Sequence, residues 1–296
     1  MSKIPQPSIL PAGPRVARYL TFSLAPDSDP AQSRAAVQAL DIDEMITVGI
    51  GEPLTEHWGG NVDGLRTFPE LSGPEVQVPS TQQALWCWLR GTDQGELALR
   101  SIAIADALGD AFRLEQVVDG FKYGDAELGK DLTGYEDGTE NPVGDDAIAA
   151  AIVQGGAPSM AGSSFVAVQQ WIHDLRYFSS LPQSDQDHII GRRKSDNEEL
   201  ADAPSSAHTK RTEQESFDPE AFVLRRSMPF ADASGEGLMF VAFGHSFDAF
   251  EVQLRRMAGL EDGVTDGLFK FSRPITGGYY WCPPVSDGRL HLASIM

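Results

Sequence analysis

The loop between residues 131 and 142 is the segment of the sequence whose residue types and spacing are most informative about chemistry. Its sequence, Asp131-Leu-Thr-Gly-Tyr-Glu-Asp-Gly-Thr-Glu-Asn-Pro142, holds four carboxylates and two glycines. The glycines allow tight turns and a close approach of the backbone to a bound group. A positioned aspartate in such a loop could move a proton. An ordinary solvated turn has the same composition. A calcium loop of the EF-hand type is disfavoured because its Asp-x-Asn-x-Asn-Gly spacing is missing.

Six histidines could serve as metal ligands or general bases: His57, His173, His188, His208, His245 and His291. A lone histidine is more often a surface residue or a core residue with satisfied hydrogen bonds, so its presence alone assigns no role. The two cysteines, Cys87 and Cys282, are too few for a disulfide framework or a structural zinc site. We expect both to be buried and structurally neutral.

Several segments follow one another in an order that resembles the dye-decolorizing peroxidase family. Gly134-Tyr-Glu-Asp-Gly138 looks like that family's Gly-x-x-Asp-Gly signature, and Thr139-Glu-Asn-Pro142 is similar to its B-type bacterial branch. The pentapeptide alone would be weak support. Four downstream segments also resemble the family: residues 169–175, 190–194, 206–212 and 224–230. The resemblance extends from about Val16 to Trp281, which is nearly the whole chain.

The resemblance implies a haem peroxidase with one haem b per chain. His208 would be the metal ligand below the ring, leaving an open position above it. There Asp137 would shuttle a proton of hydrogen peroxide, and Arg225 would stabilise the developing charge. Ser227 would be a hydrogen-bonding partner. Arg226 is the alternative arginine; the Arg-x-Ser register favours Arg225, because residues 225 and 227 would share one face of a strand.

The same resemblance assigns further cofactor contacts, namely Glu136, Gly138, Thr139, Arg211 and Phe243. Arg211 would pair with a haem propionate. Phe243 and Phe240 would line the pocket, although core packing explains both. The carboxylate behind the histidine is left open between Glu220, which the family spacing favours, and Asp218.

Five aromatic residues are oxidisable and could relay electrons from large donors: Trp171, Tyr177, Tyr279, Tyr280 and Trp281. Core packing is the more common role of such residues. The expected partners are hydrogen peroxide and a small aromatic reductant, phenolic or dye-like. The resemblance also implies a homo-oligomer.

Haem handling is the alternative function, meaning haem binding, haem delivery or release of iron from haem. Accumulation of protoporphyrin on incubation with haem would distinguish it from peroxidation. A chlorite-dismutase-like enzyme is disfavoured, because that family lacks the Gly-x-x-Asp-Gly loop.

The elements that must position these residues are predicted from apolar patterns and cap residues. Strands are expected over residues 18–25, 45–50, 81–91, 112–121, 164–171 and 237–243, and helices over 31–40, 95–108 and 249–257. Residues 85–93 and 239–248 share an apolar strand, a glycine, a polar cap and a helix. We therefore expect an α+β fold of duplicated ferredoxin-like units, with two antiparallel four-stranded sheets and peripheral helices. An N-terminal domain would span 1–135, and a haem-binding C-terminal domain 136–296.

The net charge restricts the partners. The chain has 23 Lys+Arg against 43 Asp+Glu, a formal charge of -20. Such a surface repels phosphate backbones and anionic lipid, so neither nucleic acid nor membrane is an expected partner. No apolar segment follows Met1-Ser2-Lys3, and no run reaches the roughly 18 residues that a spanning helix requires. We expect a cytoplasmic protein.

Overall fold

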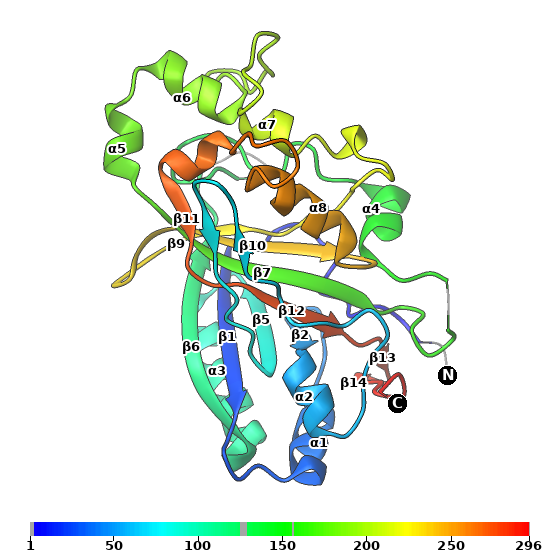
Figure 1. Ribbon diagram of the computed structural model, residues 1–296. Helices are drawn as coiled ribbons and strands as arrows, with labels where there is room; N and C mark the ends of the chain where they lie inside the picture. Colours follow the sequence, from blue (N-terminus) through cyan, green and yellow to red (C-terminus); the bar gives the residue numbers. More distant parts are fainter. Residues whose placement is uncertain (1–2, 125–128, 156, 296) are drawn as a thin grey trace.

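The computed structural model describes residues 3–124, 129–155 and 157–295 (Figure 1). In the first half, six elements lie close to the predicted ranges: β1 (Val16–Leu24), α1 (Pro30–Gln38), β2 (Ile46–Ile50), β5 (Leu85–Gly91), α3 (Gln94–Leu108) and β6 (Phe112–Phe121). A short helix that was not predicted, α2 (Glu52–His57), follows β2. The side chain of Asp93 caps α3 by accepting the Glu96 N–H at 3.0 Å. A short hairpin, β3 (Leu71–Ser72) with β4 (Gln77–Val78), lies between α2 and β5.

The second half contains more elements than the sequence predicted. The helices are α4 (Gly144–Ala151), α5 (Leu175–Ser180), α6 (Gln183–Ile190), α7 (His208–Arg211) and α8 (Asp248–Met257). The strands are β7 (Ser164–His173), β8 (Leu224–Arg225), β9 (Met228–Asp232), β10 (Gly235–Gly244), β11 (Ser272–Pro274) and β12 (Gly278–Cys282), followed by the small hairpin β13 (Val285–Ser286) and β14 (Arg289–Leu290).

The long strands join edge to edge into one sheet in the part of the chain that the structure describes. Its order is β11-β7-β12-β2-β5-β1-β6-β9-β10-β8, and β7 also pairs with β10. That extra antiparallel pairing runs through eight residue pairs, from Gly237 opposite Ile172 to Gly244 opposite Phe165. Eight strands therefore close into a ring.

The α+β class is confirmed, whereas the prediction of two separate four-stranded sheets is wrong. Each half contributes four strands, β2-β5-β1-β6 and β12-β7-β10-β9, in matching order. The two sets are joined where Trp281 lies opposite Ile50 and where Gly120 lies opposite Phe230. An open edge would leave backbone N–H and C=O groups unpaired, and closure pairs them.

The alternation of side chains along the strands divides the core into two layers. One layer gathers alternate residues from around the ring, including Tyr19, Trp86, Trp88, Phe243 and Tyr280, and fills its interior. The other layer lies on the outer face, where it packs against the helices. A residue's position along a strand, odd or even, therefore decides which layer it joins.

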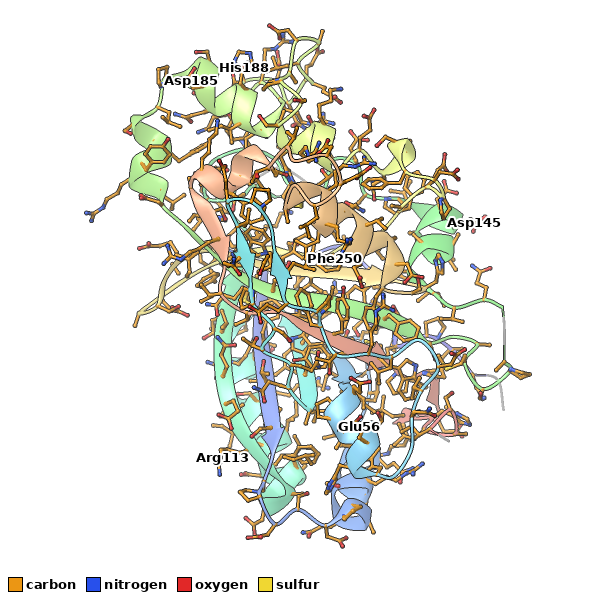
Figure 2. All side chains as sticks on the ribbon, viewed as in Figure 1. Glu56, Arg113, Asp145, Asp185, His188 and Phe250 are labelled. Atoms are coloured by element: carbon orange, nitrogen blue, oxygen red, sulfur yellow. The ribbon has the colours of Figure 1, made fainter. Side chains whose placement is uncertain are left out.

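Helix α8 covers the outer face of β7 and β10. Phe250, Leu254 and Met257 are buried at positions i, i+4 and i+7, which form one stripe of a helix. Figure 1 shows α5, α6, α7 and α8 gathered at one end of the molecule. Figure 2 shows Phe250 beneath α8, on the side facing the strands. Within the described residues, no helix combines the length and the apolar character needed to cross a bilayer.

Closure of the ring requires a glycine at position 237. A Cβ atom there would lie 1.9 Å from the carbonyl oxygen of Trp171 on β7. We predict that Gly237→Ala lowers the free energy of unfolding by about 1–3 kcal/mol, because the strands must move apart. Urea unfolding would measure the change. Gly13→Ala is the control: its Cβ meets nothing within 4 Å, so a change under about 0.5 kcal/mol is expected. Equal effects of the two substitutions would contradict the closure argument.

Candidate active site

A cavity lies between the outer face of β7 and β10 and the helices α7 and α8. Its space not filled by protein is about 660 Å³, including its opening to solvent. The apolar wall consists of Trp171, Val223, Leu238, Phe240, Phe250, Leu254, Met257 and Leu268. The polar side chains at the cavity are those of Asp137, Gln169, His173, His208, Thr212, Arg225, Gln253 and Ser272. The predicted trio of His208, Asp137 and Arg225 therefore meets at one cavity.

The ring of His208 is oriented by a buried carboxylate. His208 begins α7, and its Nδ1 lies 2.8 Å from Oδ2 of Asp266, whose side chain is 0% exposed. The other oxygen of Asp266 accepts the Leu268 N–H at 2.8 Å. A carboxylate at Nδ1 fixes the tautomer, so that Nε2 presents its lone pair.

The prediction that Glu220 or Asp218 is the carboxylate partner of His208 is wrong. Both Glu220 and Asp218 are exposed, and it is Asp266 that contacts the ring. The family spacing pointed to a residue near in sequence, whereas Asp266 lies 58 positions away. No local signal marks that residue apart from its capping position before a short 3-10 helix (Gly267–Lys270).

Asp137 is held at the cavity by the turns of its loop. Gly134 and Gly138 have φ values of +87° and +90°, which favour glycine. Asp137 is partly buried and borders the cavity. Burial raises the pKa of its carboxyl, and the negative charge of Asp131 adds to the rise, while Arg225 and His208 oppose it. The acid form of Asp137 therefore persists to a higher pH than in an ordinary aspartate.

The same loop fixes Arg225 through a side chain that the sequence did not single out. The amide oxygen of Asn141 accepts the Arg225 N–H at 2.8 Å, and its amide nitrogen donates to the Arg225 carbonyl at 3.1 Å. A Cβ at Gly138 would lie 2.8 Å from that amide nitrogen. Glycine at position 138 thus preserves the contact that joins the loop of Asp137 to the backbone of Arg225.

Arg225, and not Arg226, faces the cavity. Arg226 donates from Nη2 to the Leu10 carbonyl at 2.5 Å, and burial lowers the pKa of its guanidinium to about 10. Ser227 lies outside the set of residues that borders the main cavity. Its hydroxyl oxygen accepts the Val241 N–H at 3.2 Å, and it borders a smaller pocket together with Asp137. Its hydroxyl proton can still donate toward that pocket.

Two predicted cofactor contacts lie elsewhere. Arg211 is 4% exposed and forms two hydrogen bonds with Asp262, at 2.7 and 2.8 Å, so it is not placed for a propionate at this cavity. Phe243 belongs to the interior of the ring, where it packs 6.0 Å from Trp88. Phe240 borders the cavity, because positions 240 and 243 differ by an odd number on β10 and face opposite layers.

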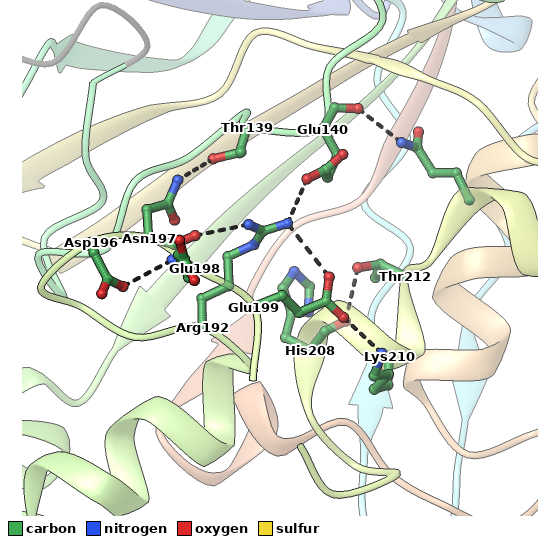
Figure 3. A network of polar contacts seen from close by, with 11 residues as sticks. Thr139, Glu140, Arg192, Asp196, Asn197, Glu198, Glu199, His208, Lys210 and Thr212 are labelled. Atoms are coloured by element: carbon green, nitrogen blue, oxygen red, sulfur yellow. Dashed lines mark hydrogen bonds and ion pairs between the residues drawn. The ribbon is translucent and has the colours of Figure 1, made fainter. Parts of the chain in front are cut away.

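The other predicted contacts border a polar recess beside the cavity. Glu136, Gly138 and Thr139 line it, together with Asp137, His208 and Arg225. Arg192 lies across the recess, with Nη2 2.5 Å from Glu140 and 3.8 Å from Glu199 (Figure 3). The sequence singled out residues 190–194 only as one of the segments that resemble the family, and the structure makes Arg192 a cation of this recess.

A second histidine–carboxylate pair borders the cavity. Nε2 of His173 lies 3.2 Å from Oδ1 of Asp131, and its Nδ1 lies 2.7 Å from the Ser272 hydroxyl. Hydrogen bonds from His173 and Thr133 outweigh the effect of burial and lower the pKa of Asp131. Both ring nitrogens of His173 are engaged, so the pair ties the start of the acidic loop to β7 and β11.

The oxidisable aromatic residues divide by position. Trp171 borders the cavity, and Tyr177 is exposed on α5. Tyr279, Tyr280 and Trp281 are buried on β12, where they pack as core residues. The two cysteines are buried and free, as expected, and burial raises the pKa of the Cys87 thiol to about 12.

Comparisons with known proteins agree on one family. Residues 129–287 match the family model described as Dyp-type peroxidase, C-terminal. A dye-decolorizing peroxidase of Mycobacterium tuberculosis is 33% identical over 266 residues, which cover 87% of this chain and 75% of that protein. One from Mycolicibacterium paratuberculosis is 30% identical, covering 95% and 84% of the two chains.

Solved structures show the same likeness. A dye-decolorizing protein from V. cholerae has a TM-score of 0.83 and 29% identity, with 95% of this chain and 97% of that chain covered. A variant of DypB from Rhodococcus jostii in complex with heme has a TM-score of 0.83 and 29% identity, with 94% and 96% covered.

The contact between Asn141 and Arg225 can be tested by unfolding. Asn141→Ala would remove the acceptor of the Arg225 N–H and one of the two donors to the Arg225 carbonyl, the other donor being Nη1 of Arg226. We predict a loss of about 1–3 kcal/mol in the free energy of unfolding, measured in urea. Asn61→Ala, at an exposed asparagine, should change it by less than about 0.5 kcal/mol. An Asn141 variant as stable as this control would show that other groups hold the strand.

Proposed function

The chain belongs to the Dyp-type peroxidase family, and from this premise we propose that it is a haem-dependent peroxidase that reduces hydrogen peroxide and oxidises small phenolic or dye-like donors. One observation carries the proposal: His208, Asp137 and Arg225, which are far apart in the sequence, border a single cavity. They supply an imidazole, a carboxylate and a guanidinium, the set that peroxide activation at haem requires.

The residues around the cavity fit a haem. Asp266 occupies Nδ1 of His208, so Nε2 is the ring nitrogen for the iron. Leu238, Phe240 and Met257 belong to the apolar wall that would contact the macrocycle. Arg192, a cation at the recess, would face the acidic groups of the cofactor. We propose haem b, one per chain.

Bound haem would supply a redox-active iron that exchanges electrons with peroxide and with the donor. The carboxylate of Asp137 would accept a proton from the oxygen of peroxide nearer the iron and return it to the outer oxygen. The guanidinium of Arg225 would stabilise the negative charge that develops as the bond between the two oxygens weakens. The apolar wall would keep competing water away from these groups.

We also propose that the chain consists of two ferredoxin-like units divided near residues 135 and 136. The matching strand order of the two sets, β2-β5-β1-β6 and β12-β7-β10-β9, supports this division. Under it, Asp137, His208 and Arg225 all belong to the second unit. The first unit would complete the ring.

Replacing the trio should separate cofactor binding from chemistry. We predict that His208→Ala loses haem on gel filtration after reconstitution. Asp137→Asn and Arg225→Leu should retain the Soret band but slow the reaction with peroxide by roughly 10²- to 10⁴-fold, measured by stopped flow. Arg113→Leu is the control, expected to react at the parental rate because Arg113 is exposed on β6 and does not border the cavity. Parental rates in both distal variants would refute the assignment.

The raised pKa of Asp137 predicts a pH dependence. The shuttle needs the carboxylate form, so the rate of peroxide reaction should fall as pH drops through this pKa. The fall should centre above the value of about 3.9 of an ordinary aspartate, which still allows the highest activity in mildly acid buffer. Stopped-flow rates between pH 3 and 8, on the order of one point per half unit, would define this fall in rate at low pH. The fall should be absent in Asp137→Asn and present in the exposed control Asp145→Asn. If Asp137→Asn still shows the fall, another group titrates there.

A further inference from the structure

One side chain at the cavity has a hydrogen-bond donor with no partner. Gln169 lies on β7, is 0% exposed and borders the cavity. Its Oε1 accepts the indole N–H of Trp171 at 3.3 Å. Among the described residues, its Nε2 meets no hydrogen-bond acceptor.

The chemistry of the neighbouring indole fixes which way the amide points. An indole nitrogen can only donate, so the amide atom that faces Trp171 must be the oxygen. The NH₂ group is therefore the end left without a partner. Rotating the amide to exchange its ends would place two donors against each other and lose the contact.

The position of Gln169 on the sheet sets its surroundings. Gln169 and Trp171 lie on the same face of β7, and Phe240 lies opposite Gln169 on β10. The ring of Phe240 packs 5.7 Å from that of Phe250 on α8. The free NH₂ group thus belongs to a wall of aromatic side chains.

A buried donor without an acceptor is unfavourable, and native structures retain one where something else supplies the acceptor. We propose that Gln169 donates a hydrogen bond to an oxygen atom carried by the aromatic molecule that occupies this cavity. This inference rests on the proposed function. Two sources share that chemistry: a carboxylate of the haem, and the oxygen substituent of a phenolic reductant.

Gln169→Met tests the proposal, because methionine keeps the length of the side chain and removes the donor. Gln170→Met is a matched control on the same strand. Gln170 is equally buried, but its amide is engaged on both ends, with Gln116 at 2.7 Å and Ser234 at 3.4 Å. The thermal midpoint of the haem-free protein should fall less in Gln169→Met than in Gln170→Met. Gln169→Met loses one hydrogen bond, from the Trp171 indole, together with an unpaired donor, whereas Gln170→Met loses two hydrogen bonds.

Two binding measurements distinguish the sources. If the acceptor belongs to the haem, ferric haem titrated into haem-free Gln169→Met should bind roughly two- to tenfold more weakly, the effect of one hydrogen bond. If the acceptor belongs to the reductant, haem affinity should be parental. The KM for 2,6-dimethoxyphenol should then rise by the same factor, while that for p-phenylenediamine, which carries no oxygen, should not change.

Parental haem affinity together with parental KM values for both donors in Gln169→Met would overturn the inference. A different result would contradict the proposed function itself: His208→Ala would still bind haem.

Discussion

The antiparallel pairing of β7 with β10 is the constraint on which the rest of the molecule depends. It closes the ring and also sets the register of the two strands that form the floor of the cavity. Gln169, Trp171 and His173 face the cavity from one strand, and Leu238 and Phe240 face it from the other. A slip of one residue would turn all of these side chains into the interior of the ring.

Much of the site could be predicted from the sequence. The strand and helix ranges of the first half agree closely with the apolar patterns and cap residues, as at Asp93 before α3. His208, Asp137 and Arg225 were found because short motifs mark them and because those motifs occur in a family order. The choice of Arg225 over Arg226 relied on the Arg-x-Ser register, and Arg225 is the arginine that borders the cavity. Strand β8 ends at Arg225, however, and Ser227 lies outside the main cavity.

The remaining features depend on contacts that no local pattern encodes. Asp266 reaches His208 only because the segment after α8 folds back onto α7. Arg211 is placed next to the histidine by the sequence, yet the helical turn directs its guanidinium to Asp262. The resemblance places Phe243 in the pocket, and because residues 237–243 are all apolar, no alternation along the strand shows which of them face inward. Two separate sheets were expected because the pairing of edge strands between the two halves produces no recognisable sequence pattern in either half.

The two hydrogen bonds between Asn141 and the backbone of Arg225 link the loop that carries Asp137 to the strand that carries the Arg225 guanidinium. They affect the motions of these two groups as well as their positions. Local opening that lifts the loop of residues 131–142 displaces Asp137 and at the same time removes both hydrogen bonds from Asn141 to Arg225, while β8 stays paired with β10. Motion of the carboxylate is therefore transmitted to the backbone that carries the guanidinium.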